Sequence, residues 1–378
     1  MRGVKIPFNR PYITGREIEY IRQTHAGGRL SGDGPFTKRC HIWLEENACS
    51  AKALLTHSCT AALEMAALLI DVKPGDEIIM PSFTFVSTAN AFVLRGGVPV
   101  FVDIRPDTLN IDERLIEQAV TAKTRAIVAV HYAGVGCEMD AILEVAGRFG
   151  LYVIEDAAQG ILARYKAKPL GAIGHLGAYS FHETKNIHSG EGGAILVNDP
   201  KFVEFAEIIR EKGTDRARFF RGEVDKYTWR SIGSSYLPSE IVAAFLCAQL
   251  EQAESLTERR LSIWHQYHEA FAQIEQRRTV RRPVVPTHCQ HNGHIYYLLL
   301  QSRAARDAAI STLSEAGVRA IFHYIPLHSS PAGRRFGRAS GSLPITDRVA
   351  DTIVRLPIWV GMDESHIQYV ASAVQAVL

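Results

Sequence analysis

Short apolar runs alternate with segments of helical periodicity along the N-terminal part of the chain. The runs predict buried strands at 53–56, 76–81, 97–103, 124–131, 151–155 and 193–198, and the periodic segments predict helices at 16–25, 36–47, 58–70, 112–121 and 139–149. Strands that alternate with helices at this spacing indicate βαβ units. We therefore expect an α/β domain with a mostly parallel sheet that is covered by helices on both faces.

The chain after Pro238 shows a different pattern. Residues 238–275 keep a helical period for longer than one globular helix needs, with a break near Ser255–Thr257. A proline-containing connector at 283–291 precedes a predicted strand at 295–300, a helix at 303–316, a strand at 318–324 and a last helix at 363–378. The length of 378 residues favours two domains. We place a large α/β domain at 1–254 and a small C-terminal α+β domain at 255–378.

Composition and charge exclude several classes of protein. The formal net charge of +2 is close to balanced and gives no reason to expect a nucleic-acid partner. Six cysteines without a C-x-x-C pair argue for reduced thiols and against a zinc site. The N-terminus lacks the apolar segment of a signal peptide, and the longest apolar stretch, 61–72, is too short to span a membrane. We expect a cytoplasmic protein without a metal, nucleic-acid or membrane partner.

The candidate chemistry begins at the end of the predicted strand 151–155. This strand delivers Asp156 at its C-terminal end, where ligands bind in open α/β sheets. Gln159 follows three residues later, and the next apolar run leads through Ser180 to Lys185. Pyridoxal phosphate (PLP) requires such a set, because a lysine holds its aldehyde as a Schiff base and an aspartate keeps its pyridine nitrogen protonated. The order of these residues therefore predicts a PLP site.

Ser58, Cys59 and Thr60 open the helix that follows the predicted strand 53–56. Free N–H groups at the positive end of a helix form a ready anion site. An ordinary N-cap is the far commoner use of such residues, and only the downstream PLP pattern favours phosphate. No G-x-G-x-x-G follows a first strand, so a nicotinamide-dependent oxidoreductase is poorly supported.

Two further segments leave alternatives open. The glycine-rich segment 27–35 is read as a turn cluster or as a mobile loop near the substrate. Basic and aromatic residues interleave in the segment 210–230, which is either a solvated charged loop or a clamp in which arginines hold a diphosphate and aromatic rings stack on a nucleobase. In the second reading the substrate contacts include Arg221, Lys226, Tyr227 and Trp229.

With these residues in view, the chain resembles the PLP-dependent enzymes of fold type I and, more narrowly, the DegT/DnrJ/EryC1 sugar aminotransferases. The likeness runs essentially end to end. The motifs that carry it are Ser58-Cys-Thr-Ala-Ala-Leu63, Pro81-Ser-Phe-Thr-Phe-Val-Ser-Thr-Ala-Asn90, Glu155-Asp-Ala-Ala-Gln159, Ser180-Phe-His-Glu-Thr-Lys-Asn186 and Gly190-Glu-Gly-Gly193.

The resemblance implies a role for each candidate residue. Lys185 would be the catalytic lysine, Asp156 would pair with the pyridine nitrogen, and Gln159 would contact the ring oxygen. The phosphate would be held by Ser180 and the backbone of Cys59 and Thr60, Phe85 would stack on the ring, and His323 and Tyr324 would contact substrate. Many members have Gly-x-Asn-Tyr-Arg where this chain has Gly233-Ser-Ser-Tyr-Leu237. The asparagine reaches the cofactor phosphate of the neighbouring subunit, so Ser235 would replace it with a shorter reach.

The implied activity is transfer of an amino group from glutamate to the C4 ketone of a nucleotide-linked, and specifically dTDP-linked, 4-keto-6-deoxyhexose. The implied assembly is a homodimer with active sites at the subunit interface. Lys185 should then lie in a mostly desolvated pocket, because a lysine that acts as a base near neutral pH needs a lowered pKa. The alternatives are a dehydratase of the same fold, which has histidine at the position of Lys185, and a non-catalytic regulatory protein with the PLP fold.

Overall fold

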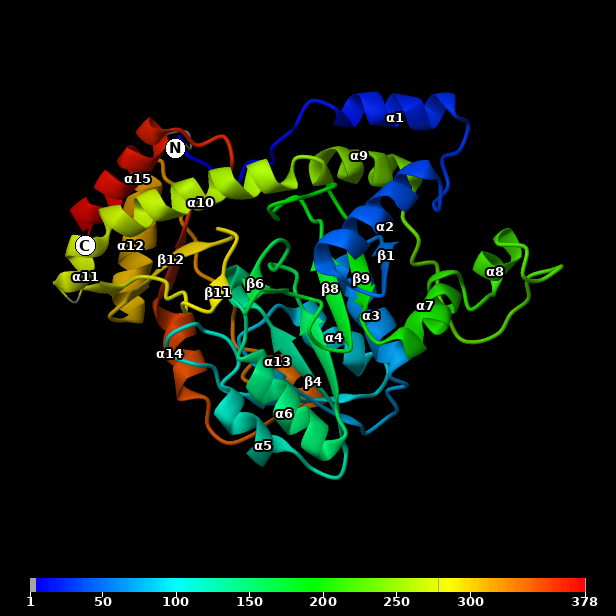
Figure 1. The fold of residues 1–378 in the computed structure, drawn as a ribbon. Helices are drawn as coiled ribbons and strands as arrows, with labels where there is room; N and C mark the ends of the chain where they lie inside the picture. The colour runs from blue at the N-terminus through cyan, green and yellow to red at the C-terminus, as the bar shows by residue number, and fades with distance from the viewer. Residues whose placement is uncertain (1–4, 278, 378) are drawn as a thin grey trace.

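A computed structural model describes residues 5–277 and 279–377. Its largest feature is an eight-stranded sheet in the order β1-β9-β8-β5-β4-β2-β3-β13. Figure 1 labels β1, β9, β8 and β4 of this sheet. All neighbouring strands pair in parallel except β9, which is antiparallel to both β1 and β8. The strands are β1 (Lys52–Thr56), β2 (Glu77–Pro81), β3 (Val98–Val102), β4 (Thr124–Val130), β5 (Tyr152–Asp156), β8 (Leu176–Ser180), β9 (Gly193–Val197) and β13 (Arg338–Ala339). The prediction of a mostly parallel α/β sheet is confirmed.

Both faces of the sheet are buried, which explains why its strands read as continuous apolar runs. Alternate residues of β2 enter different cores: Ile78 packs with helix α3 (Cys59–Leu69), and Ile79 packs with helix α6 (Met139–Phe149). The first core also receives residues from α4 (Val86–Val93) and α7 (Val203–Arg210), and the second from α5 (Ile116–Ala119). A further core is formed by α1 (Glu17–Ala26), α2 (Pro35–Ala48) and α9 (Glu240–Leu250), whereas α8 (Arg216–Phe220) has no buried residue.

A second, three-stranded antiparallel sheet lies in the C-terminal part of the chain, in the order β10-β12-β14. It comprises β10 (Val280–Arg281), β12 (Tyr296–Leu300) and β14 (Ile353–Leu356). Its own core includes aromatic residues such as Tyr267 and Phe271. The helices near it are α10 (Ala253–Ala270), α11 (Ala272–Gln276), α12 (Arg303–Glu315), α14 (Pro344–Thr352) and α15 (Glu364–Val377) (Figure 1). The short helix α13 (Pro331–Phe336) instead contacts β3 of the large sheet. The division of the chain at residue 254 stays a prediction.

Three predicted boundaries need correction. The predicted strand 318–324 is reduced to isolated bridges at Val318, with Ile6, and at Ile321, with Arg355. The backbone then turns to a positive φ of 33° at Tyr324, which ends the extended segment. The predicted helix 112–121 is a 3₁₀ turn followed by the short α5. The helical break lies at Glu251–Gln252, and the predicted break at Ser255–Thr257 falls inside α10.

The remaining predictions concern the ends of the chain, the cysteines and membrane-spanning helices. Residues 1–4 and Leu378, which belong to the predicted domains and last helix, lie outside the described residues. All six cysteines are free. Among the described residues no helix is both long and apolar enough to cross a membrane.

Candidate active site

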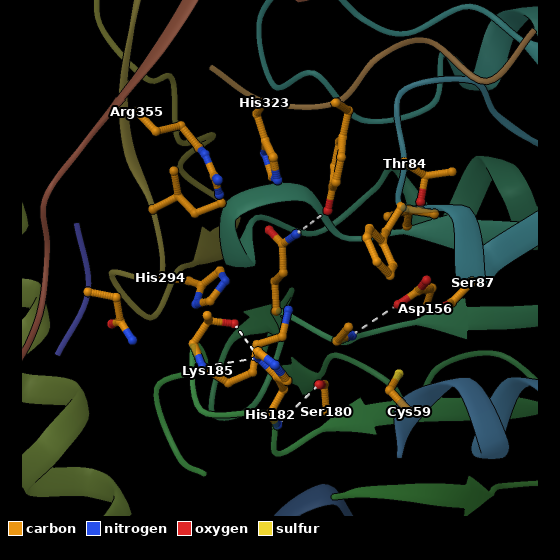
Figure 2. A pocket seen from close by; sticks show the side chains of 18 of the residues that line it. Cys59, Thr84, Ser87, Asp156, Ser180, His182, Lys185, His294, His323 and Arg355 are labelled. Atoms are coloured by element: carbon orange, nitrogen blue, oxygen red, sulfur yellow. Dashed lines mark hydrogen bonds between the residues drawn. The ribbon is translucent and has the colours of Figure 1, made fainter. Parts of the chain in front are cut away.

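A cavity of about 570 Å³ lies at the C-terminal ends of the parallel strands β4, β5 and β8. The long loop between β8 and β9 also lines it and carries Lys185 into it (Figure 2). On the other side the cavity is lined by residues of the C-terminal part, among them His294, His323 and Arg355. Nine predicted site residues lie here: Cys59, Thr60, Phe85, Asp156, Gln159, Ser180, Lys185, His323 and Tyr324.

The N-terminus of α3 forms one end of this cavity. Ser58 caps the helix by accepting the backbone N–H of Ala61 at 3.1 Å. In the part of the chain that the structure describes, the N–H groups of Cys59 and Thr60 have no acceptor. The Thr60 hydroxyl lies 2.8 Å from that of Ser87, and both residues line the cavity. Free amides, hydroxyls and the helix dipole together suit a phosphate group.

Gly193, the first residue of β9, allows this end of the cavity to form. A Cβ atom at this position would lie 2.4 Å from the backbone nitrogen of Cys59. The strand can therefore approach the start of α3 only without a side chain. The glycine that ends the Gly190–Gly193 motif thus brings β9 against the amides that face the cavity.

Asp156 is held at the end of β5 by two hydrogen-bond donors. Its Oδ2 accepts the hydroxyl of Thr88 at 2.6 Å, and its Oδ1 accepts the N–H of Ala158 at 3.2 Å. Thr88 lies on α4, is fully buried and also bonds the hydroxyl of Thr84. The carboxylate is only 6% exposed and has no ion-pair partner among the described residues. It is therefore suited to a protonated ring nitrogen.

Lys185 presents an amine without a partner. Within residues 5–277 and 279–377 its Nζ makes no hydrogen bond or ion pair. Burial lowers the pKa of this amine, and the nearby Cys59 and Asp156 offset only part of the effect. Burial also raises the pKa of the Cys59 thiol well above its usual value, so Cys59 stays protonated. The lowered pKa of Lys185 is in the direction predicted for a lysine that must act as a base.

Gln159 links the two sides of the cavity. Its Oε1 accepts the N–H of Ala133 at 2.7 Å, and its Nε2 donates to the hydroxyl of Tyr324 at 3.1 Å. The rings of Tyr324 and His323 stack with 3.6 Å between centroids. These bonds fix which atom of the Gln159 amide is the donor. Phe85 lies at the N-terminus of α4 and is 57% exposed.

Five predicted site residues lie outside the cavity. Arg221, Lys226, Tyr227, Trp229 and Ser235 belong to the segment 211–235, which includes α8 and projects from the body of the molecule (Figure 1). Arg221 forms ion pairs with Glu207 and Glu223. Trp229 is 79% exposed and donates its indole N–H to the carbonyl of Ser231. Among the described residues, these five side chains make no hydrogen bond or ion pair with a residue that lines the cavity.

The structure adds cavity residues that the sequence patterns did not indicate. His294 was missed, as was Arg355, although an arginine inside the apolar segment Ile353–Leu356 is itself an unusual signal. Thr88, which holds Asp156 from a buried position outside the cavity lining, was also missed. His294 is buried, and its Nδ1 lies 2.8 Å from the Oδ1 of Asn186, the residue after Lys185. Asn186 donates to the carbonyl of Asn292, so its oxygen faces His294 and accepts the Nδ1 proton.

Comparison with known proteins also indicates an aminotransferase. Residues 11–375 match the DegT/DnrJ/EryC1/StrS aminotransferase family. The spore coat polysaccharide biosynthesis protein SpsC of Bacillus subtilis is 33% identical, over 99% of this chain and 97% of its own. GDP-perosamine synthase of Caulobacter vibrioides is 32% identical, over 99% and 98%. The solved structure of an aminotransferase from Psychrobacter cryohalolentis superposes with a TM-score of 0.92 at 27% identity, over 98% of both chains.

Proposed function

The chain belongs to the DegT/DnrJ/EryC1/StrS aminotransferase family, and from that premise we propose that it moves an amino group from L-glutamate to C4 of dTDP-4-keto-6-deoxy-D-glucose. The product would be dTDP-4-amino-4,6-dideoxy-D-galactose, the sugar nucleotide used in enterobacterial common antigen synthesis. The proposed enzyme is a cytoplasmic homodimer with active sites at the subunit interface.

Membership in the family confirms three predictions from the sequence. The fold is the PLP-dependent transferase fold of type I. The cofactor is pyridoxal phosphate, and the protein is a PLP-dependent sugar transaminase. Family membership does not identify the sugar nucleotide, which we propose from finer features of the chain.

Three segments support the proposed sugar nucleotide. Phe220–Trp229, Gly233–Tyr236 and Phe322–His328 resemble the corresponding parts of dTDP-4-amino-4,6-dideoxygalactose transaminase. The first two lie in the projecting segment 211–235, where Arg221, Lys226, Tyr227 and Trp229 offer cations and exposed rings. Such a surface suits the diphosphate and base of a nucleotide. Because it lies outside the cavity of its own chain, we propose that it, with Ser235, serves the active site of the partner subunit.

The observation that carries the reaction is that the amine of Lys185, unpaired among the described residues, shares one cavity with Asp156 and the open N-terminus of α3. The phosphate of the cofactor would lie against Cys59, Thr60 and Ser180, and Asp156 would pair with its pyridine nitrogen. When bound, pyridoxal phosphate supplies an aldehyde that carries the amino group and a protonated ring that stores electrons.

Lys185 would carry the proton in both halves of the reaction. Its lowered pKa leaves a larger neutral fraction near pH 7, so the amine can take the α-proton of glutamate. The same amine would return a proton to C4 of the sugar, and the face from which it does so sets the galacto configuration. Gln159, fixed by Ala133 and Tyr324, would hold the ring oxygen of the cofactor in place.

A single-turnover absorbance experiment tests this function. Purified protein loaded with pyridoxal phosphate is mixed with glutamate, the amino acid is removed, and dTDP-4-keto-6-deoxyglucose is added. We expect the visible absorbance of the cofactor to disappear with glutamate and to return with the sugar, and NMR of the product to show the galacto configuration. Absorbance that disappears and does not return would show that the proposed sugar is wrong. If the visible absorbance of the cofactor never develops when pyridoxal phosphate is added, Lys185 does not have its proposed role.

A further inference from the structure

Two cysteines from different helices meet outside the active-site cavity. Cys40 lies on α2 and Cys247 on α9, and these two helices pack against each other (Figure 1). Both residues belong to the same hydrophobic core, and both line a separate cavity of about 250 Å³. The proposed transaminase function gives neither thiol a role.

The register of α9 against α2 brings the two thiols together. Glu240 is the first residue of α9, and its buried carboxylate accepts three backbone N–H groups at the start of α2, at 2.9–3.0 Å. Cys247 lies two helical turns after Glu240 and therefore on the same face of α9. The Sγ of Cys40 lies 3.4 Å from the carbonyl oxygen of Ala243, one turn before Cys247 on that face. From this position the thiol of Cys40 hydrogen-bonds that of Cys247.

A cation is held at the edge of this cavity. The guanidinium of Arg39, which lines it, lies over the ring of Tyr20 at 5.0 Å from the centroid and forms an ion pair with Glu251. Glu251 also pairs with Arg16 at 3.2 Å, so two arginines share its charge. The charge of Arg39 consequently affects Cys247 more strongly than that of Glu251 does.

The two thiols differ in their readiness to ionise. The hydrogen bond from Cys40 and the charge of Arg39 lower the pKa of Cys247, against the opposing effects of burial and of nearby carboxylates. Burial raises the pKa of the Cys40 thiol well above its usual value, so Cys40 keeps its proton. Cys247 is 4% exposed and Cys40 is 0% exposed, so a small molecule in the cavity reaches Cys247 first. Such a pair combines an attacking thiolate with a second thiol that can resolve its oxidised form.

The other four cysteines have different surroundings. Cys137 and Cys289 share a core, but burial raises the pKa of both thiols and the charge of Glu138 raises it further. Cys59 lies in the active-site cavity, where burial raises its pKa. Cys49 is exposed at the end of α2. The chain thus provides its own controls: a second buried pair beside a carboxylate, and a single accessible thiol.

We propose that Cys40 and Cys247 form a peroxide-reactive site at which the two thiols are reversibly oxidised to a disulfide. The thiolate of Cys247 attacks one oxygen of hydrogen peroxide, so that an S–O bond forms and the O–O bond breaks. Cys247 becomes a sulfenic acid, and the released hydroxide combines with the proton that Cys247 lost on ionising. The sulfur of Cys40 then attacks that of Cys247, the S–S bond forms, the S–O bond breaks, and the hydroxide leaves as water with the proton of Cys40.

The overall reaction balances without a cofactor. Two thiols lose two electrons and two protons, and one peroxide is reduced to two molecules of water. A dithiol reductant reverses the change by thiol–disulfide exchange. Disulfides in a reducing compartment are typically transient and redox-sensing, which fits the cytoplasmic location proposed above.

Peptide mapping of the oxidised holoenzyme tests the proposal. Reduced protein is freed of reductant, treated with equimolar hydrogen peroxide, blocked with N-ethylmaleimide and digested with trypsin. We expect a disulfide that joins the peptides 40–52 and 231–259, and its loss on addition of dithiothreitol. The first peptide also contains Cys49, so fragment ions and two variants assign the bond. Cys40→Ala should abolish the bond, and Cys49→Ala should retain it.

Two further measurements test the separate roles of the residues. In Cys40→Ala the sulfenic acid of Cys247 should persist and be trapped by dimedone, whereas Cys247→Ala should show no such product at Cys40. Arg39→Gln should slow the formation of the disulfide at pH 7 about 10-fold, because the thiolate of Cys247 loses its nearest cation. Arg39→Lys keeps the charge and should react faster than Arg39→Gln. Arg22→Gln removes an exposed arginine of α1 and should react as the wild type does.

Several outcomes would overturn the proposal. These are peroxide treatment that modifies Cys49 without linking Cys40 to Cys247, a bond between Cys137 and Cys289 that forms equally fast, or an unchanged rate in Arg39→Gln. The absorbance of the bound cofactor reports whether each variant folds, and the fragment ions of the wild-type peptides decide the assignment if one does not. A failure to aminate the proposed sugar nucleotide would leave the disulfide unaffected, so the two proposals fail independently.

Discussion

The hydroxyl of Thr88 is a specific target for a test of how Asp156 is held. Thr88→Val replaces the hydroxyl with a methyl group of similar size, and valine and threonine have similar helix propensities. The substitution leaves the buried carboxylate of Asp156 with the N–H of Ala158 as its remaining donor. It also removes the partner of the Thr84 hydroxyl. The packing of α4 should otherwise be unchanged.

The expected cost follows from the charge of the acceptor. A hydrogen bond to an ionised group contributes about 1.5–3 kcal/mol, and this bond is 2.6 Å long and fully buried. The entropy of unfolding is about 2.1 cal/mol/K per residue, which gives about 0.8 kcal/mol/K for 378 residues. Thr88→Val should therefore lower the Tm of the cofactor-free protein by about 2–4 °C.

Calorimetry of four proteins isolates the bond: the wild type, Thr88→Val, Asp156→Asn and the double variant. We expect a coupling free energy of about 1 kcal/mol or more, because the valine should cost less once the carboxylate is gone. Thr88→Ser keeps the hydroxyl and serves as the control, with a smaller loss from the missing methyl group. Additive effects of the two substitutions would refute the view that Thr88 acts through Asp156.

Three further predictions concern Lys185 and the projecting segment. Lys185→Ala should fold, with a Tm no lower than that of the wild type without cofactor, but should show no turnover and no covalently bound cofactor; turnover at the wild-type rate would contradict its role. Burial lowers the pKa of Lys185 in the folded protein below its ordinary value of 10.5. Between the folded-state pKa and the unfolded-state pKa the unfolded chain therefore binds more protons, so the free energy of unfolding of the cofactor-free protein rises with pH. Lys185→Met should remove this rise in urea titrations at several pH values, and an unchanged slope would be evidence against it. Arg221→Ala should raise the KM for the sugar nucleotide about 10-fold and leave that for glutamate unchanged, whereas equal effects on both would exclude a nucleotide clamp.

The central sheet was predictable because both of its faces are buried. Strand β2 is buried at every position, so its apolar run marks it without help from a helical or alternating period. The nearness of Asp156 and Lys185 was also predictable, since β5 and β8 pair in parallel and end at the same edge. The direction of β9 was not predicted. The connection from β8 contains no crossover helix, and the chain therefore returns antiparallel.

The C-terminal part was less predictable because its signals are short or contradictory. Residues 318–324 have the composition of a strand, yet Tyr324 adopts a positive φ and the segment pairs only at isolated bridges. Strand β14 was missed because Arg355 interrupts a short apolar run. Spatial neighbours such as His294 and Lys185 are far apart in sequence, and no local pattern connects them. Position in the tertiary structure, rather than residue type, identifies these side chains.

The cavity receives its residues from two different hydrophobic cores, and this division has an evolutionary consequence. Asp156, Ser180 and Lys185 are attached to the large sheet, whereas His294 and Arg355 are attached to the small one. Substitutions in 290–358, other than at Asn292, His294 and Tyr324, which bond Asn186 and Gln159, can therefore reshape the far side of the cavity while the framework around Asp156 and Lys185 is inherited intact. The same separation tells a protein engineer where to randomise: a library that is confined to the small-sheet side and spares His294 and Tyr324 should yield new substrate preferences at little cost to cofactor retention.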